Sequence, residues 1–140
     1  MVPLTQNNFS AALDLLKKNN LPTEDISEAT SMFVVEEQNT VTGTIALEYA
    51  GSDGLLRSLA VAADHRQHGV GGELVAFIEA YAVRQGIQQL YLLTTTAEKF
   101  FAKRGYVVVE RSAVSPFIKN SSEFASVCPS TAVVMKKTIS

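Results

Sequence analysis

The spacing of apolar residues in the N-terminal part of the chain predicts a short strand followed by two helices. Residues 7–19 carry apolar side chains at intervals of three and four positions, which is typical of one face of a helix. Pro22 suits the first position of a second, shorter helix. Residues 1–5 are the expected edge strand before them. The helical spacing ends before residue 32, where the pattern changes.

From residue 32 the pattern favours strands, because β-branched and other apolar residues follow one another in short runs. Two turns interrupt these runs, at residues 38–40 and 51–54, where polar residues and glycines gather. We therefore expect an antiparallel meander of strands at residues 32–37, 41–50 and 55–62.

The rest of the chain alternates helices with short apolar strands. The helix expected at residues 69–85 has an apolar stripe and ends before Gly86, which suits a helix C-terminus. The later predicted elements are a strand at 89–94, a helix at 96–104 before Gly105, a strand at 106–110, a helical turn at 115–119 and a last strand at 132–136. This order indicates a mixed α/β layer fold, in which the strand order could part and leave a cleft between residue 54 and the helix at 69.

Composition and charge narrow the class of protein. The 140 residues, 46% of them hydrophobic, suffice for one globular domain, and we predict a single domain over residues 1–140. Twelve basic and 14 acidic residues leave a net charge of −2, which lacks the basic footprint of nucleic-acid-binding proteins. No apolar run reaches the roughly 18 residues of a membrane span, and no signal-peptide pattern is visible. With one cysteine and no internal disulfide, we expect a cytoplasmic protein without nucleic-acid or membrane partners.

A glycine-rich loop lies between the strand at 55–62 and the helix at 69–85. Its residues are Arg66, Gln67, His68, Gly69, Val70, Gly71 and Gly72. The first N–H groups of a helix lack intrahelical partners and lie at the positive end of its dipole, so they bind anions. Glycines let the backbone approach a phosphate closely, and Arg66 adds positive charge. The loop therefore indicates a pyrophosphate site, with a tight turn that binds nothing as the alternative.

Two known phosphate motifs do not fit this loop. No Gly-Lys-Ser or Gly-Lys-Thr follows as in a P-loop, and the glycine order differs from the dinucleotide fingerprint. The order Arg66-x-x-Gly69-x-Gly71 instead resembles the signature of the GNAT superfamily of acetyl-CoA-dependent N-acetyltransferases: Arg or Gln, two residues, Gly, one residue, Gly or Ala. Residues 100–106 resemble a second marker of that family, an aromatic residue followed after three residues by Gly and another aromatic residue.

The resemblance extends over residues 33–106 and implies the GNAT acyl-CoA N-acyltransferase fold, a mixed α/β sheet. In this fold the strands at 55–62 and 89–94 are expected to splay apart and form a cleft. It also implies acetyl-CoA as co-substrate, direct transfer of the acetyl group to an amine, and no metal. Homodimers are common in the superfamily, and the last strand is the candidate contact. Residues 54–61, 92–98 and 124–129 resemble small acetyltransferases of arsenic-resistance operons. A more distant similarity is to the acetyltransferase domain of N-acetylglutamate synthase.

The resemblance assigns further coenzyme-binding positions outside the loop. In the family, the strand before the loop offers its backbone to the pantetheine arm and the thioester, and the corresponding residues are Leu59, Ala60 and Val61. Thr94 lies where relatives often have an asparagine that contacts the pantetheine. Phe101 stands where many relatives have a tyrosine that serves as general acid. Because phenylalanine has no proton to donate, the alternatives are Tyr106, water or departure of the thiolate without an acid.

Glu48 and Arg57 are charged residues within apolar strands. If the turn centres on residues 52–53, the two lie opposite each other, and the cost of burying an unpaired charge predicts an ion pair. Such a pair is either purely structural or part of the site. In the second interpretation Glu48 takes or relays the amine proton, while Arg57 and Ser58 bind a carboxylate-bearing acceptor, such as an amino acid or an analogue of one.

The sequence as a whole predicts an acetyl-CoA-dependent N-acetyltransferase acting on a small amine. Cys128 is expected to be a packed residue rather than a nucleophile, and His65 and His68 lack a matching set of metal ligands. Because Phe101 replaces the usual acid, a non-catalytic acyl-CoA-binding sensor and an interaction module on the same fold remain alternatives.

Overall fold

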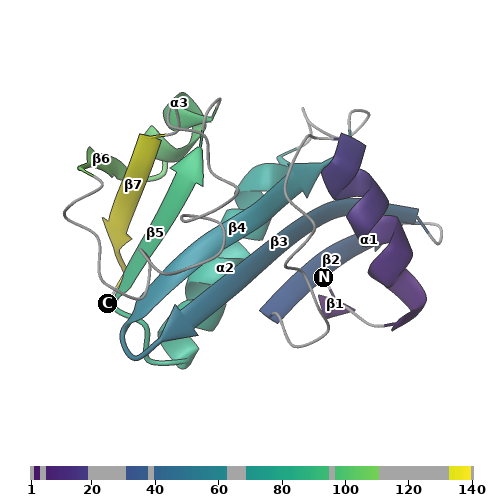
Figure 1. Ribbon diagram of the computed structural model, residues 1–140, viewed down its shortest axis with the longest axis horizontal. Helices are drawn as coiled ribbons and strands as arrows, with labels where there is room; N and C mark the ends of the chain where they lie inside the picture. The colour runs from purple at the N-terminus through teal and green to yellow at the C-terminus, as the bar shows by residue number, and fades with distance from the viewer. Residues whose placement is uncertain are drawn as a thin grey trace. The chain divides into compact units, whose positions relative to one another are not determined.

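The computed structural model describes residues 2–3, 6–18, 31–37, 40–62, 69–94, 97–110 and 133–139. In chain order, its elements are β1 (Val2–Pro3), α1 (Gln6–Lys18), β2 (Ser31–Glu37), β3 (Thr40–Ala50), β4 (Asp53–Val61), α2 (Val70–Arg84), β5 (Gln89–Thr94), α3 (Glu98–Ala102), β6 (Val107–Val109) and β7 (Val133–Thr138) (Figure 1). The chain packs as two compact units. The first unit is Met1–Glu48 with Leu56–Tyr81, and the second is Tyr49–Leu55 with Ala82–Ser140.

The strands of the first unit direct their side chains alternately towards two helices. The strand order is β1-β2-β3-β4, and β1, β2 and β3 pair antiparallel. Met32 and Val34 of β2 belong to one buried cluster with the apolar stripe of α1. Phe33 lies on the other face, where its ring meets Phe77 and Tyr81 of α2 edge-on at centroid distances of 4.9 and 5.0 Å. Figure 1 shows α1 in front of these strands and α2 behind them.

The second unit joins the start of β4 to three later strands. The first residues of β4 and β5 pair in parallel, with Asp53 opposite Gln89 and Leu55 opposite Tyr91. β7 lies antiparallel between β5 and β6. β7 is therefore flanked by a strand on each side, and a dimer contact at the last strand stays a prediction. Dimerisation itself stays a prediction.

A glycine follows each of the helices α2 and α3. After α2, the N–H groups of Gly86 and Ile87 donate to the carbonyls of Val83 and Ala82, at 3.1 and 3.0 Å. Gly86 has a φ of 83°, in the left-handed region that glycine adopts without steric cost. Gly105, with a φ of 92°, ends α3 in the same way. The helix end predicted before Gly86 is confirmed to within one residue, whereas α3 ends at Ala102, two residues before its predicted end.

The predicted mixed α/β fold is confirmed. β5 has the predicted bounds, and α2 differs from its prediction by one residue at each end. α3 is shorter than the predicted helix at 96–104. The N–H of Ala97, the residue before α3, donates to Thr94 Oγ1 at 2.9 Å and so has a side-chain acceptor. Among the described residues, no helix has the length and apolar character needed to cross a membrane.

Some expectations fall outside the described residues. These are the helix opened by Pro22, the centre of the turn at 38–40 and the helical turn at 115–119. The complete order of elements is therefore untested. The cleft between β4 and β5 and the single-domain organisation also stay predictions.

Candidate functional site

The start of α2 presents a row of backbone donors. Gly69 has a φ of 76°, and its carbonyl accepts the first intrahelical hydrogen bond, from the N–H of Glu73 at 3.1 Å. The N–H groups before Glu73 have no intrahelical acceptor, and they belong to Gly69, Val70, Gly71 and Gly72. Four of the seven loop residues predicted to bind a pyrophosphate thus lie where a helix attracts anions.

A glycine of β3 lets the first turn of α2 lie close to the sheet. A Cβ atom on Gly43 would be 3.0 Å from Leu74 Cδ1 and 3.3 Å from Val70 Cγ1. A side chain there would press on the side chains of Leu74 and Val70, through which α2 packs on β3. The sequence prediction did not single out Gly43, although an isolated glycine inside a strand pattern often marks such a close approach.

β4 is distorted at Ser58, just before the stretch predicted to receive the thioester. Ser58 has a φ of 59°, a left-handed conformation that is uncommon for residues other than glycine. Thr44 Oγ1 donates a hydrogen bond of 2.7 Å to the Ser58 carbonyl. Further along, the N–H of Ala62 donates to the Thr42 carbonyl at 2.8 Å. The backbone between Ser58 and Ala62 is thus tied to β3 at both ends.

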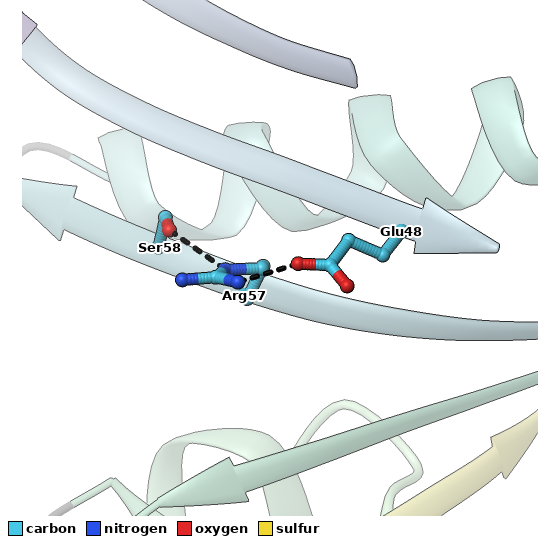
Figure 2. Close-up of polar contacts among 3 residues, drawn as sticks. All are labelled: Glu48, Arg57 and Ser58. Carbon is cyan, nitrogen blue, oxygen red and sulfur yellow. Dashed lines mark hydrogen bonds and ion pairs between the residues drawn. The ribbon is translucent and has the colours of Figure 1, made fainter. Parts of the chain in front are cut away.

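The predicted ion pair between Glu48 and Arg57 is present (Figure 2). Arg57 Nη1 lies 2.5 Å from Glu48 Oε1, and Arg57 Nε donates to Ser58 Oγ at 3.3 Å. The Arg57 side chain is 0% exposed, whereas the Glu48 side chain is 27% exposed. One oxygen of Glu48 thus binds the buried guanidinium, and the carboxylate still reaches solvent. This arrangement holds the carboxylate in a fixed place, which suits a group that accepts a proton.

The three residues after Ser58 differ in burial. Ala60 is buried, while Leu59 and Val61 are half-buried. Ser58 itself is 8% exposed, so its side chain offers little surface to an acceptor. The predicted contacts of these residues with a ligand stay predictions.

In the second unit, Phe101 is a packing residue. It is 4% exposed, and its ring meets those of Phe100 and Tyr106 edge-on at 5.0 and 5.5 Å. Tyr106 is also buried, at 2%. Arg104 lies over the Phe100 ring, 3.7 Å from its centroid, and donates to the Phe100 carbonyl. Thr94, at the end of β5, accepts the hydrogen bond from the Ala97 N–H.

Several predicted residues lie outside the described part of the chain. These are Arg66, Gln67 and His68 of the loop, together with His65 and Cys128. Their expected roles stay predictions. Within the described ranges, no group of three or more His, Cys, Asp or Glu residues could hold a metal ion.

Thr44 is the site residue that sequence reasoning missed. Its side chain is buried within β3, and its hydroxyl contacts the backbone of the neighbouring strand. A polar residue within an apolar run is the only local signal for such a role, and threonine is common in strands. Neither the sequence nor the turn geometry indicates its partner.

The chain is similar to known proteins over more than half of its length. A family profile described as acetyltransferase (GNAT) domain matches residues 28–108, more than half of the chain. An amino-acid acetyltransferase of Ectopseudomonas mendocina (strain ymp) is 43% identical over 75 residues, which make up 52% of this chain and 17% of that protein. The chain therefore spans less than a fifth of the length of the curated relatives it matches.

Solved structures support the same fold. N-acetylglutamate synthase from Neisseria gonorrhoeae, complexed with coenzyme A and N-acetyl-glutamate, has a TM-score of 0.83 at 19% identity, covering 100% of this chain and 34% of that one. Rv2747 from Mycobacterium tuberculosis, in complex with CoA, has a TM-score of 0.80 at 20% identity, covering 96% and 95%. The narrower resemblance to arsenic-resistance acetyltransferases stays a prediction. On the family match and the shared fold, the chain belongs to the acetyltransferase (GNAT) domain family.

Proposed function

We propose that this chain is an N-acetyltransferase that uses acetyl-CoA and transfers the acetyl group directly to the amine of a small acceptor. The start of α2 is the observation that carries this proposal, because its backbone donors precede the first intrahelical hydrogen bond. Such donors bind phosphate oxygens, and Gly71 and Gly72 have no Cβ atom to keep a ligand away. We assign the coenzyme pyrophosphate to this helix start and to the preceding Arg66, Gln67 and His68.

The acyl end of the donor is assigned to β4. Acetyl-CoA supplies an acetyl group activated as a thioester, whose carbonyl needs a hydrogen-bond donor as negative charge develops on its oxygen. Ser58 turns the following backbone away from a regular strand, which supports the assignment of that donor to Leu59, Ala60 or Val61. Thr94 stays a proposed pantetheine contact. Phe101, with 4% of its surface exposed, contributes at most a small apolar contact.

Glu48 is the proposed base. An amine is protonated at neutral pH, since its pKa is near about 10, and it must lose a proton before it attacks. The Glu48 carboxylate is partly exposed and held by Arg57, so it can accept this proton directly or through a water molecule. The complete burial of the Arg57 side chain favours a role through Glu48 over direct contact with the acceptor. Direct binding of an acceptor carboxylate by Arg57 stays a prediction.

No general acid is assigned to the leaving thiolate. Phe101 has no proton to donate, and the Tyr106 ring is packed against it. A thiol has a pKa of about 8.5, so a thiolate leaves with little assistance near neutral pH. We therefore propose that the thiolate departs without a side-chain acid and is protonated by solvent.

The proposed acceptor is an amino acid or a carboxylate-bearing analogue. The support is the 43% identity with an amino-acid acetyltransferase over 75 residues, together with the family match over residues 28–108, which include β4 and the loop. The test is release of free thiol from acetyl-CoA with a panel of amino acids and with matching amines that lack the carboxylate. Turnover with the amino acids alone supports the proposal, and equal turnover with the amines overturns the acceptor assignment.

A second candidate is a non-catalytic acyl-CoA-binding sensor, which the phenylalanine at position 101 favours. Calorimetric titration with acetyl-CoA distinguishes the two functions when it is combined with the thiol assay. Binding without thiol release by any acceptor indicates a sensor, whereas absence of binding rejects both coenzyme-dependent functions.

A further inference from the structure

Ser58 holds a strained conformation inside the proposed donor site. Its φ of 59° is the one positive value found outside glycine in the part of the chain that the structure describes. A serine avoids this region when it is free, because its Cβ approaches the backbone. Such a conformation persists only when the surrounding structure holds it, and it is often found at functional sites.

Two side chains hold Ser58, from two directions. Thr44 donates to its carbonyl at 2.7 Å, and Arg57 Nε donates to its hydroxyl at 3.3 Å. The Thr44 contact is the shorter one and acts on the backbone itself. Thr44 is 0% exposed, so its hydroxyl has no exchange with bulk water, and losing this bond would leave the Ser58 carbonyl without that donor.

The consequence extends to the next residues along β4. A turn of the Ser58 peptide back to an extended conformation would redirect the N–H and carbonyl groups that follow. Ala62 is already fixed by its hydrogen bond to the Thr42 carbonyl, so the segment between them takes up any change. That segment, Leu59 to Val61, is the backbone to which the thioester is assigned.

We propose that Thr44 is a positioning residue for the acetyl donor, acting through the backbone of Ser58. This proposal rests on the proposed function, because it needs an acetyl-CoA thioester on the Leu59–Val61 backbone. Thr44 touches neither substrate in this scheme. Its hydroxyl selects the backbone direction that presents a donor to the thioester carbonyl.

The test compares two threonines of the same strand. Thr44→Val removes the hydroxyl and keeps the shape, while Thr44→Ser keeps the hydroxyl. Thr42→Val is the matched control, because Thr42 is also buried and its hydroxyl bonds only weakly, at 3.4 Å, to the Val35 carbonyl. We expect Thr44→Val to raise the KM for acetyl-CoA about tenfold, because one lost buried hydrogen bond changes an equilibrium by about this factor. The KM for the acceptor should change by less than about twofold. In Thr44→Ser and in Thr42→Val, both KM values should stay within about twofold of those of the wild type.

A rescue experiment separates positioning from stability. Glycine adopts the left-handed region without the penalty that serine carries. Ser58→Gly in the Thr44→Val background should therefore recover most of the acetyl-CoA KM, although the lost hydroxyl is not restored. If Thr44→Val does not fold, Thr44→Ala with and without Ser58→Gly provides the same comparison.

The outcomes distinguish this proposal from the proposed function. Calorimetry on the wild-type protein comes first, and absence of acetyl-CoA binding overturns both. If the wild type binds and turns over but Thr44→Val keeps its acetyl-CoA KM, the positioning role is wrong and the proposed function stands. The same conclusion follows if Thr42→Val has an equal effect, or if Ser58→Gly restores nothing.

Discussion

Two clusters of side chains, one in each unit of the chain, are held together by different interactions. In the first unit, Glu48, Arg57 and Ser58 are joined by directed hydrogen bonds and an ion pair. In the second, Phe101 and Tyr106 contact each other edge-on through their rings. Ring packing tolerates small shifts, whereas a hydrogen bond or a proton transfer depends on direction.

In the proposed function the chemistry resides in the polar cluster. A residue of that cluster should then lose its function even when its replacement has the same size, because it contributes charge and hydrogen bonds rather than volume. A residue of the aromatic cluster contributes volume and ring contact, so its loss appears in the free energy of unfolding. The predictions below test this division, with kinetics as the readout for one unit and stability for the other.

The largest effect is expected for Glu48→Gln, which keeps the shape of the side chain and removes the base. General-base catalysis contributes about 10²- to 10⁴-fold, and we expect kcat to fall about 100-fold. The acidic limb of the pH profile of kcat/KM should flatten, because the group that must be deprotonated is gone. Asp14→Asn, at an exposed carboxylate of α1, is the control, and it should change neither kcat nor the pH profile of kcat/KM. An unchanged pH profile for Glu48→Gln would assign the ion pair a structural role only.

Gly43→Val should have the next largest effect, because it forces a side chain between β3 and the first turn of α2. Overpacking of a core costs about 1–3 kcal/mol, and we expect a loss of about 2 kcal/mol in the free energy of unfolding. The KM for acetyl-CoA should rise more than the acceptor KM, since the displaced turn carries the proposed phosphate donors.

Gly51→Ala is the control for that experiment. Gly51 has a φ of 61°, with nothing within 4 Å of an added Cβ atom. The substitution strains the backbone by about 1 kcal/mol without pushing on α2, so stability should fall and the acetyl-CoA KM should not change. Equal changes in the acetyl-CoA KM for Gly43→Val and Gly51→Ala would mean that the packing of α2 against Gly43 does not affect acetyl-CoA binding.

The sequence predicted the elements well and the site only in part. Apolar spacing was enough for α2 and β5, because each buries one pattern against its neighbours. The pairing of Glu48 with Arg57 followed from the position of a turn and the cost of an unpaired buried charge. Both are inferences from local pattern and simple energetics.

What the sequence did not show depends on contacts across the sheet. A left-handed serine at position 58 has no local signature, since nothing in its neighbours along the chain requires it. It is held by Thr44, 14 residues away, through a hydrogen bond that exists only in the folded chain. The close packing of α2 on Gly43 likewise depends on how β3 and α2 meet in the folded chain, and neither segment shows it alone.

Phe101→Leu tests the aromatic cluster. The substitution removes two edge-to-face ring contacts, each worth about 0.5–1.5 kcal/mol, so we expect the free energy of unfolding to fall by about 1.5 kcal/mol. Because the ring is nearly buried, the acetyl-CoA KM should change less than about threefold. Thermal unfolding and steady-state kinetics on the same sample measure both. A larger rise in KM with little loss of stability would show that the ring mainly contacts the donor, against the division proposed here.

The smallest effect concerns Tyr91, which packs with Leu55 and Val134 in the second unit. Burial, and then the negative charge of Asp53, raise the pKa of the Tyr91 hydroxyl above its ordinary value. In the unfolded chain the Tyr91 hydroxyl therefore ionises at a lower pH than in the folded protein. Its contribution to the free energy of unfolding is complete below the unfolded pKa of about 10 and is lost as the pH rises through the folded pKa. Tyr91→Phe should weaken this alkaline loss and leave stability at pH 7 within about 1 kcal/mol, since its hydroxyl makes a long 3.2 Å bond to Gln89 Oε1. Denaturant unfolding at pH 7 and at alkaline pH measures the difference, and Tyr49→Phe, at an exposed tyrosine, is the control. If the free energy of unfolding falls equally with alkaline pH in the wild type and in Tyr91→Phe, the prediction is wrong.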